Sequence, residues 1–169
     1  MTTTTTLTAT NTSNLTPACK GIVSALNRAG VPVIVDPGIK TGFNARGMYY
    51  NQTIWLYEAP SGDCSTLAHE AVHWLQEQPG TALIGRQAVP KGKEAVIKTV
   101  QERYSSLAWN KEYAAWALQD EPGVVLKLLE QAAPPPPPPP WGGLPTPAVV
   151  GMAIAISAVA TWLMLRLTK

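Results

Sequence analysis

The sequence predicts an α+β domain: a small three-stranded sheet preceded by one helix and followed by several helices, with one C-terminal transmembrane helix beyond it. Three observations lead to this prediction. The chain contains short β-branched runs bounded by turn residues, long segments without helix breakers, and an uncharged apolar stretch behind a run of prolines. Its 169 residues are enough for one domain of ordinary size, but not for two.

The N-terminal region predicts a disordered leader followed by a first helix. Residues 1–15 are rich in threonine and lack the charged start and apolar middle of a secretory signal. Thr16 and Pro17 are typical of a helix N-cap and first helical position, and Gly30 is typical of the position just past a helix end. We therefore expect a helix over Ala18–Ala29.

Three strand-like runs follow this helix. Val31–Val35 is β-branched and is closed by a turn at Asp36, Pro37 and Gly38. Arg46–Tyr50 and Thr53–Tyr57 are separated by only two residues, Asn51 and Gln52, a spacing that favours a hairpin. The three runs predict the sheet.

The segments after the hairpin predict four helices. The first starts near Ser61–Asp63 and continues until Pro79 and Gly80 break it. The later segments are amphipathic or rich in helix-forming residues. The expected ranges are Cys64–Gln78, Lys91–Ala108, Asn110–Asp120 and Pro122–Ala132. Together with the first helix and the sheet, they define a predicted domain over residues 16–133.

The C-terminal region predicts a membrane anchor. Pro134–Pro140 are seven consecutive prolines, so residues 134–147 form a stiff spacer, in which the proline run spans roughly 20 Å as polyproline II. Residues 148–165 carry no charge over 18 positions, near the lower limit for a membrane-spanning helix, and residues 166–169 are a short basic tail. Small residues at Gly151 and Ala155 would allow self-association of this helix.

Membrane orientation is left open by the sequence. Because the N-terminal leader lacks the features of a secretory signal, the simplest interpretation is a tail anchor with the domain in the cytoplasm, and we adopt it as the expectation. Arg166 and Lys169 favour the opposite orientation, with the tail inside.

Charge and cysteine content exclude two classes of protein. The 13 basic and 11 acidic residues nearly cancel, so a nucleic-acid partner is not expected. Two cysteines, Cys19 and Cys64, are too few for a disulfide framework, and we interpret them as free thiols.

The two histidines of the chain both lie in one motif, His69-Glu70-Ala71-Val72-His73. Residues four apart share one face of a helix, so both imidazoles can bind one Zn²⁺ ion. Glu70 then lies beside the metal, where a carboxylate can take a proton from an attacking water as general base. The motif predicts a zinc-dependent peptidase that hydrolyses peptide or protein substrates.

The motif and the strands before it resemble the core of minimal gluzincin peptidases, including the ImmA/IrrE-like metallopeptidases. The resemblance rests on Tyr49-Tyr50, Thr53–Leu56 and Ser65–His73, and covers about residues 18–119. It implies a minimal zincin core in which the strand before the motif helix is an edge strand that pairs with extended substrate. That role would fall on Ile54, Trp55, Leu56 and Tyr57, although packing is an equal alternative for Trp55 and Tyr57.

The resemblance also implies a third zinc ligand, a glutamate on a later helix. Glu94, Glu102 and Glu121 have charged or helix-ending surroundings, which are typical of solvated positions. Glu112 instead has apolar helical neighbours, and a carboxylate there needs compensation such as a metal ion. We therefore predict Glu112 as the ligand, with Asp120 as the reserve. Tyr104 or Tyr113 is a candidate donor to the oxyanion.

Two other functions remain open from the sequence. The polyproline run could serve as a docking segment of a catalytically silent membrane adaptor. The apolar tail could instead belong to a membrane-active assembly protein.

Overall fold

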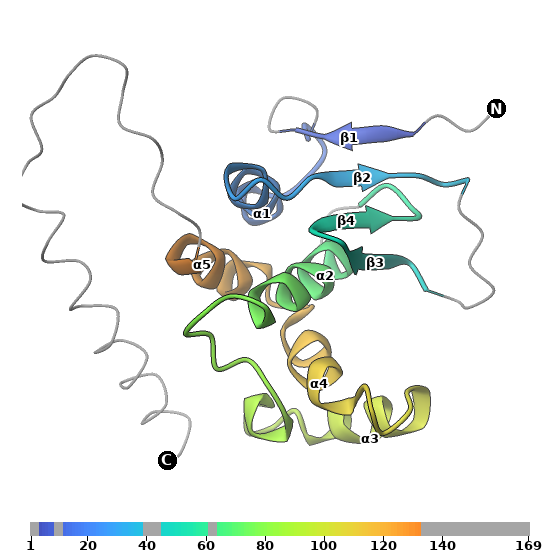
Figure 1. Cartoon of the computed structure of the whole chain (residues 1–169), viewed down its shortest axis with the longest axis vertical. Coiled ribbons are helices and arrows are strands. Elements are labelled where there is room, and N and C mark those ends of the chain that lie inside the picture. The colour runs from blue at the N-terminus through green and yellow to red at the C-terminus, as the bar shows by residue number, and fades with distance from the viewer. Residues whose placement is uncertain (1–3, 9–11, 39–44, 61–63, 133–169) are drawn as a thin grey trace, which may run out of the picture. The chain divides into compact units, whose positions relative to one another are not determined.

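The computed structural model describes residues 4–8, 12–38, 45–60 and 64–132, and it has the predicted α+β class. Four strands lie side by side, with the helices grouped beside them (Figure 1). Residues 1–134 form one compact unit. The predicted spacer and membrane span fall outside the described residues. Within the described ranges, no helix is long and apolar enough to cross a membrane.

The sheet has four strands rather than the three expected. They are β1 (Thr5–Leu7), β2 (Val33–Val35), β3 (Gly47–Tyr50) and β4 (Thr53–Leu56), in the order β1-β2-β4-β3. β1 pairs antiparallel with β2, so the prediction of disorder is wrong for Thr5–Leu7. Only one of its three residues, Leu7, is buried, so the sequence of β1 gives little sign of a strand. Pairing with β2 defines the strand instead.

The hairpin forms as predicted, but its second strand is not at an edge. β4 pairs antiparallel with β3 and parallel with β2, so it has a neighbour on each side. Asn51 and Gln52 both have positive φ angles, 49° and 57°, as a two-residue type I′ turn requires. Among the described strands, β3 and β1 form the two edges of the sheet.

The first helix, α1 (Pro17–Arg28), begins and ends as its cap residues predict. Thr16 is the N-cap, and its hydroxyl accepts a hydrogen bond from the Cys19 amide. Gly30 follows the helix with a positive φ angle of 77°. One face of α1, which includes Ile22, Val23 and Leu26, is fully buried in the core.

The two cysteines form a disulfide, which corrects the prediction of free thiols. Cys19 on α1 is bonded to Cys64, the residue just before α2 (Ser65–Gln76). Both side chains are almost completely buried. The bond therefore fixes the start of the motif helix to the first helix, across 45 positions of sequence.

The remaining helices are α3 (Glu94–Arg103), α4 (Trp109–Leu118) and α5 (Pro122–Ala132), with a short 3-10 turn over Arg86–Ala88 before them. α5 has its predicted bounds. α3 is shorter than the predicted Lys91–Ala108, because the backbone becomes extended at Tyr104. The Tyr104 carbonyl accepts a hydrogen bond from the Trp109 indole at 3.0 Å, which satisfies it outside the helix.

The core lies between one face of the sheet and the helices. Strand residues Leu7, Val33, Val35, Ile54 and Leu56 are buried there. They belong to one large cluster with residues of α1, α2, α4 and α5. The alternate strand residues, such as Met48 and Tyr50, are on the exposed face. The motif helix α2 therefore runs through the centre of the domain, with eight of its residues buried.

Candidate metal centre

The predicted motif lies on helix α2, and its two histidines are on the same face of that helix, as their spacing of four residues predicts. Leu67, Ala68, Ala71, Val72 and Leu75 are fully buried in the core. His69 and His73 are one turn apart, and their Nε2 atoms are 3.2 Å from each other. His69 is only 8% exposed, so the pair lies mostly out of contact with water.

Helix α4 brings Glu112 to the two histidines. Glu112 Oε2 is 3.3 Å from His69 Nε2, and Glu112 Oε1 is 3.5 Å from His73 Nε2. Glu112 is in the first turn of α4, where its backbone amide bonds to the Ala108 carbonyl. The predicted trio of side chains thus meets at one place in the structure.

The other acidic candidates lie elsewhere. Glu94 is exposed and accepts a hydrogen bond from the Gly92 amide at 3.0 Å. Glu102 lies 3.7 Å from Lys98, and Glu121 pairs with Lys93. Asp120, the reserve candidate, is exposed. None of these residues is in the cluster of potential ligands found in the described part of the chain, which consists of His69, His73 and Glu112.

The geometry and the donor set fit a metal ion. Ligand atoms in a tetrahedral site with bonds of about 2.1 Å are about 3.4 Å apart. Here the two Nε2 atoms are 3.2 Å apart, and one ligand atom from each of the three residues lies within 4.8 Å of the others. Glu112 Oε2 is buried, and its contact with His69 Nε2 at 3.3 Å is not aligned as a hydrogen bond. A buried carboxylate oxygen in this state is costly unless a cation compensates it. Two imidazoles and a carboxylate could therefore hold one metal ion.

The charges in the cluster keep Glu112 ready to bind a cation. Burial raises the pKa of Glu112, but the close contact with His69 and the charges of both histidines outweigh this effect and lower it. Burial lowers the pKa of His69, yet the close contact with Glu112 and the charges of Glu70 and Glu112 raise it above its ordinary value. Burial and the neighbouring charge of His69 lower the pKa of His73. The carboxylate therefore stays ionised at neutral pH.

Glu70 lies beside the cluster and is not part of it. It is 7% exposed, and burial raises the pKa of its carboxyl group to about 7. The carboxylate accepts a hydrogen bond from the Tyr49 backbone amide on β3, which opposes this increase. A carboxyl group with a pKa near neutrality can both accept and return a proton at physiological pH.

The edge strand β3 lies close enough to α2 to require a glycine. A Cβ atom at Gly47 would be 2.8 Å from Thr66 Cγ2 and 3.2 Å from Glu70 Cγ. The Tyr57 amide donates to the Arg46 carbonyl, so Arg46 and Tyr57 are a hydrogen-bonded pair of the hairpin. Hydrogen-bonded and non-hydrogen-bonded pairs alternate along an antiparallel ladder, so the backbone groups of Gly47 and Tyr49 face away from β4. Glu70 therefore contacts the free edge of the sheet.

The predicted substrate strand needs a correction. Ile54, Trp55 and Leu56 are on the interior strand β4, whose backbone is paired on both sides, so this segment cannot add a peptide strand as an edge would. Ile54 and Leu56 are buried in the core, and Trp55 is on the opposite face of the sheet. Tyr57 lies just past the strand, where burial and the charge of Glu70 raise its pKa.

Aromatic residues line the side of the cluster formed by α3 and α4. The Trp116 ring is edge-on to His69 at 5.7 Å between centroids, and Arg103 covers Trp116 at 4.9 Å. The Trp116 indole donates to the Tyr104 hydroxyl at 3.2 Å. Burial and the charge of nearby Glu112 raise the pKa of the Tyr104 hydroxyl. Tyr113 is instead buried, with its hydroxyl bonded by Gln101. Of the two predicted oxyanion donors, Tyr104 is the one beside the cluster.

Two glutamines outside the predicted site lie beside the histidines. Gln76 Oε1 is 3.0 Å from His73 Nδ1, and Gln119 lies close enough to His69 to help raise its pKa. Gln76 is three residues after His73 on the same helix, so helical spacing alone could have identified it. Gln119 follows the last turn of α4, and only the packing of the two helices brings it to His69.

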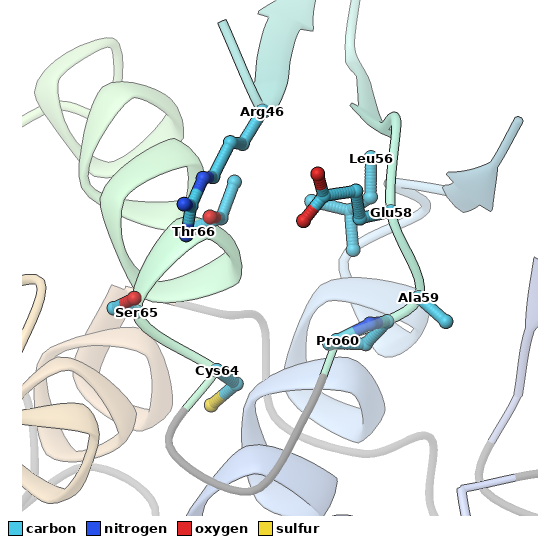
Figure 2. A pocket seen from close by; sticks show the side chains of 8 residues that line it. All are labelled: Arg46, Leu56, Glu58, Ala59, Pro60, Cys64, Ser65 and Thr66. Atoms are coloured by element: carbon cyan, nitrogen blue, oxygen red, sulfur yellow. The ribbon is translucent and has the colours of Figure 1, made fainter. Parts of the chain in front are cut away.

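A cavity of about 130 Å³ lies at the other end of α2. Arg46 and Glu58 flank it, beside Cys64, Ser65 and Thr66 (Figure 2). Leu56 is the one member of the predicted substrate strand in its lining. No residue of the histidine and glutamate cluster is in this lining, so the cavity and the cluster are separate features.

No protein-family model matches the chain, and no curated protein or solved structure matches it either. The similarity to minimal gluzincin peptidases therefore stays a prediction from motifs and their spacing.

Proposed function

We propose that the chain is a zinc-dependent metallopeptidase. The observation that carries this proposal is the convergence of His69, His73 and Glu112, from two different helices, next to a buried Glu70. Two imidazoles and one carboxylate form the ligand set of many catalytic zinc sites, which leave one position for water or substrate. A zinc ion held by these residues would supply a Lewis acid and an acidified water.

Glu70 is the general base in this proposal. Its pKa of about 7 suits a group that takes a proton from the attacking water and later gives it to the leaving amine. Tyr104 is placed to donate a hydrogen bond to the developing oxyanion, because its hydroxyl is beside Glu112. Each step that moves a proton thus has a residue of this chain assigned to it.

An extended peptide is the substrate class that the site favours. β3 has outward-facing backbone groups at Gly47 and Tyr49. The Tyr49 amide is already bonded to Glu70, so a peptide would pair with the other groups, beside the general base. A free strand edge can pair with a peptide through main-chain hydrogen bonds. This edge replaces the predicted Ile54–Tyr57 segment, which is interior or past the strand end.

The test is zinc content and peptide cleavage by the full-length chain in detergent. We expect one zinc ion per chain for the unchanged protein and for Glu70→Gln, and loss of stoichiometric zinc for Glu112→Ala. Glu102→Ala is the matched control, because Glu102 is exposed and lies outside the cluster. On a quenched peptide library, Glu70→Gln should lower the rate by a factor of about 100 to 10,000.

Two results would reject the proposal. One is an absence of zinc from the unchanged protein at saturating metal. The other is a Glu70→Gln variant that cleaves peptides at a rate within twofold of the unchanged protein, since no other described carboxylate is placed to act as the base.

We also propose that residues 148–165 anchor the domain to a membrane, on the side away from the cytoplasm. The anchor is supported by the uncharged apolar sequence. The side is supported by the Cys19–Cys64 disulfide, since disulfides persist in oxidising compartments. Arg166 and Lys169 favour the same orientation, with the tail inside. This replaces the expectation of a cytoplasmic domain.

An impermeant thiol reagent tests this orientation in intact cells. Ser106→Cys places a thiol on an exposed loop of the domain, and Leu167→Cys places one after the apolar stretch. Labelling of the first variant alone is expected. Labelling of the second alone would reverse the orientation.

A further inference from the structure

Gln76 makes three polar contacts with its side-chain amide. Its Oε1 is 3.0 Å from His73 Nδ1, and its Nε2 donates to the Leu83 carbonyl at 2.8 Å and to the Lys111 carbonyl at 2.7 Å. It is the last residue of α2. One amide therefore connects the motif helix, the loop after it and the start of α4.

The two carbonyl partners determine which way the amide faces. A carbonyl oxygen can only accept, so the NH₂ group of Gln76 must face Leu83 and Lys111. This leaves Oε1, which can only accept, facing His73. His73 Nδ1 must then carry the proton, and the neutral ring has its free lone pair on Nε2.

That Nε2 atom is the one that belongs to the cluster. It is 3.2 Å from His69 Nε2 and 3.5 Å from Glu112 Oε1. The opposite tautomer would place a proton where a metal ion needs a lone pair. The contact with Gln76 therefore selects the form of His73 that can bind a metal.

The same amide also restrains the third ligand. Lys111 directly precedes Glu112, and its carbonyl is held by Gln76. The loop is tied to α4 a second time, because the Gly85 amide donates to the Asn110 carbonyl at 2.9 Å. Displacing Gln76 would free the ring of His73 and remove one of these two hydrogen bonds to the start of α4.

We propose that Gln76 is a positioning residue that fixes the Nδ1–H tautomer of His73 and holds α4 so that Glu112 meets the same point. The consequence for zinc rests on the proposed function. The tautomer itself does not, since it is set by hydrogen bonds within the metal-free chain.

The test begins with the ring nitrogens of the metal-free, full-length protein. The chain has only two histidines, so a long-range ¹H–¹⁵N spectrum at alkaline pH contains two imidazole patterns. The expected pattern for His73 is a protonated Nδ1 and an unprotonated Nε2. Gln76→Met keeps the length of the side chain but cannot accept, so the two tautomers should average. Zinc affinity should fall by about 10- to 100-fold.

Two further variants separate tautomer selection from folding. Gln76→Glu keeps an acceptor for Nδ1 and loses the donors to both carbonyls, so it should retain the Nδ1–H tautomer while its zinc affinity falls. Gln78→Met is the matched control, because the side chain of Gln78 lies near the same helix end and, among the described residues, donates only to the Trp74 carbonyl, at 3.1 Å. It should change neither the tautomer nor the affinity.

Several outcomes would overturn the role of Gln76. They are a protonated Nε2 on His73 in the unchanged protein, a Gln76→Met variant with the same tautomer and zinc affinity within twofold, or a Gln76→Glu variant that loses the tautomer. Should Gln76→Met not fold, the Gln76→Glu spectrum still decides the matter. If the tautomer and the zinc affinities change as expected but no peptide is cleaved, only the proposed peptidase function would be rejected.

Discussion

The two ends of α2 are held in different ways. At its N-terminal end, which we call the disulfide end, Cys64 is bonded to α1 and Gly47 allows β3 to approach Thr66 closely. At its C-terminal end, the ligand end, His73 and Gln76 are held by hydrogen bonds to side chains and carbonyls. A covalent bond and a close-packed contact thus secure the start of the helix, and polar contacts orient its last turn, which carries His73.

The largest expected effect on stability comes from breaking the disulfide end. Closing a loop of 45 residues stabilises the folded state by about 4 kcal/mol in the chain-entropy model. Reduction, or the double substitution Cys19→Ala with Cys64→Ala, should lower the free energy of unfolding in urea by about that amount. Reductant should have no effect on the double variant. An unchanged urea midpoint after full reduction of the natural protein would mean that packing alone fixes this end.

The next effect concerns the charge of Glu70 and depends on pH. Its folded pKa of about 7 is above the ordinary value of 4.5, so its ionisation opposes folding as pH rises from 4.5 through 7. Glu70→Gln removes this penalty and keeps the acceptor for the Tyr49 amide. The metal-free variant should therefore be about 3 kcal/mol more stable than the natural protein at pH 8, and equal to it at pH 4.

Urea unfolding at both pH values measures this difference. A stability gain of the same size at pH 4 and pH 8 would contradict the electrostatic explanation, since the carboxyl group is protonated in both the folded and the unfolded chain at the lower pH.

The smallest effect tests the close packing of β3 on α2. A Cβ atom at position 47 would be 2.8 Å from Thr66 Cγ2 on α2 and 3.0 Å from the Trp55 carbonyl on β4, a backbone atom that cannot move away easily. Gly47→Ala should therefore destabilise the domain by about 2 kcal/mol. Gly123→Ala is the control, because nothing lies within 4 Å of an added Cβ there. In helix α5 it should stabilise by up to about 1 kcal/mol. Equal thermal midpoints of the two variants would show that β3 has room to shift.

The sequence predicted features that depend on neighbouring residues. The Thr16 cap, the turn at Asn51 and Gln52, and the bounds of α5 all follow from local preferences, and they are present. Glu112 was predicted partly from its apolar helical neighbours, and the structure brings it to both histidines. Two of those neighbours face α2: Ala115 is in the core cluster, and the Trp116 ring is edge-on to His69.

The features that the sequence did not predict depend on distant pairing. β1 is a strand because it pairs with β2, and β4 is interior because it pairs with Val33–Val35 as well as with β3. A hairpin pattern identifies two neighbouring strands, but it does not say which of them pairs with a third. Cys19 and Cys64 are likewise 45 positions apart, and nothing near either residue indicates the other.

The bond between Cys19 and Cys64 makes a closed ring of the chain between them, and that ring contains β2, β3 and β4. A peptide bond cut anywhere within the ring would leave both pieces joined, as one molecule heavier by one water. Such a nick would be invisible on a non-reducing gel and would give two bands after reduction. Self-cleavage of the sheet region can therefore be detected by gel only when reduced and non-reduced samples are run side by side.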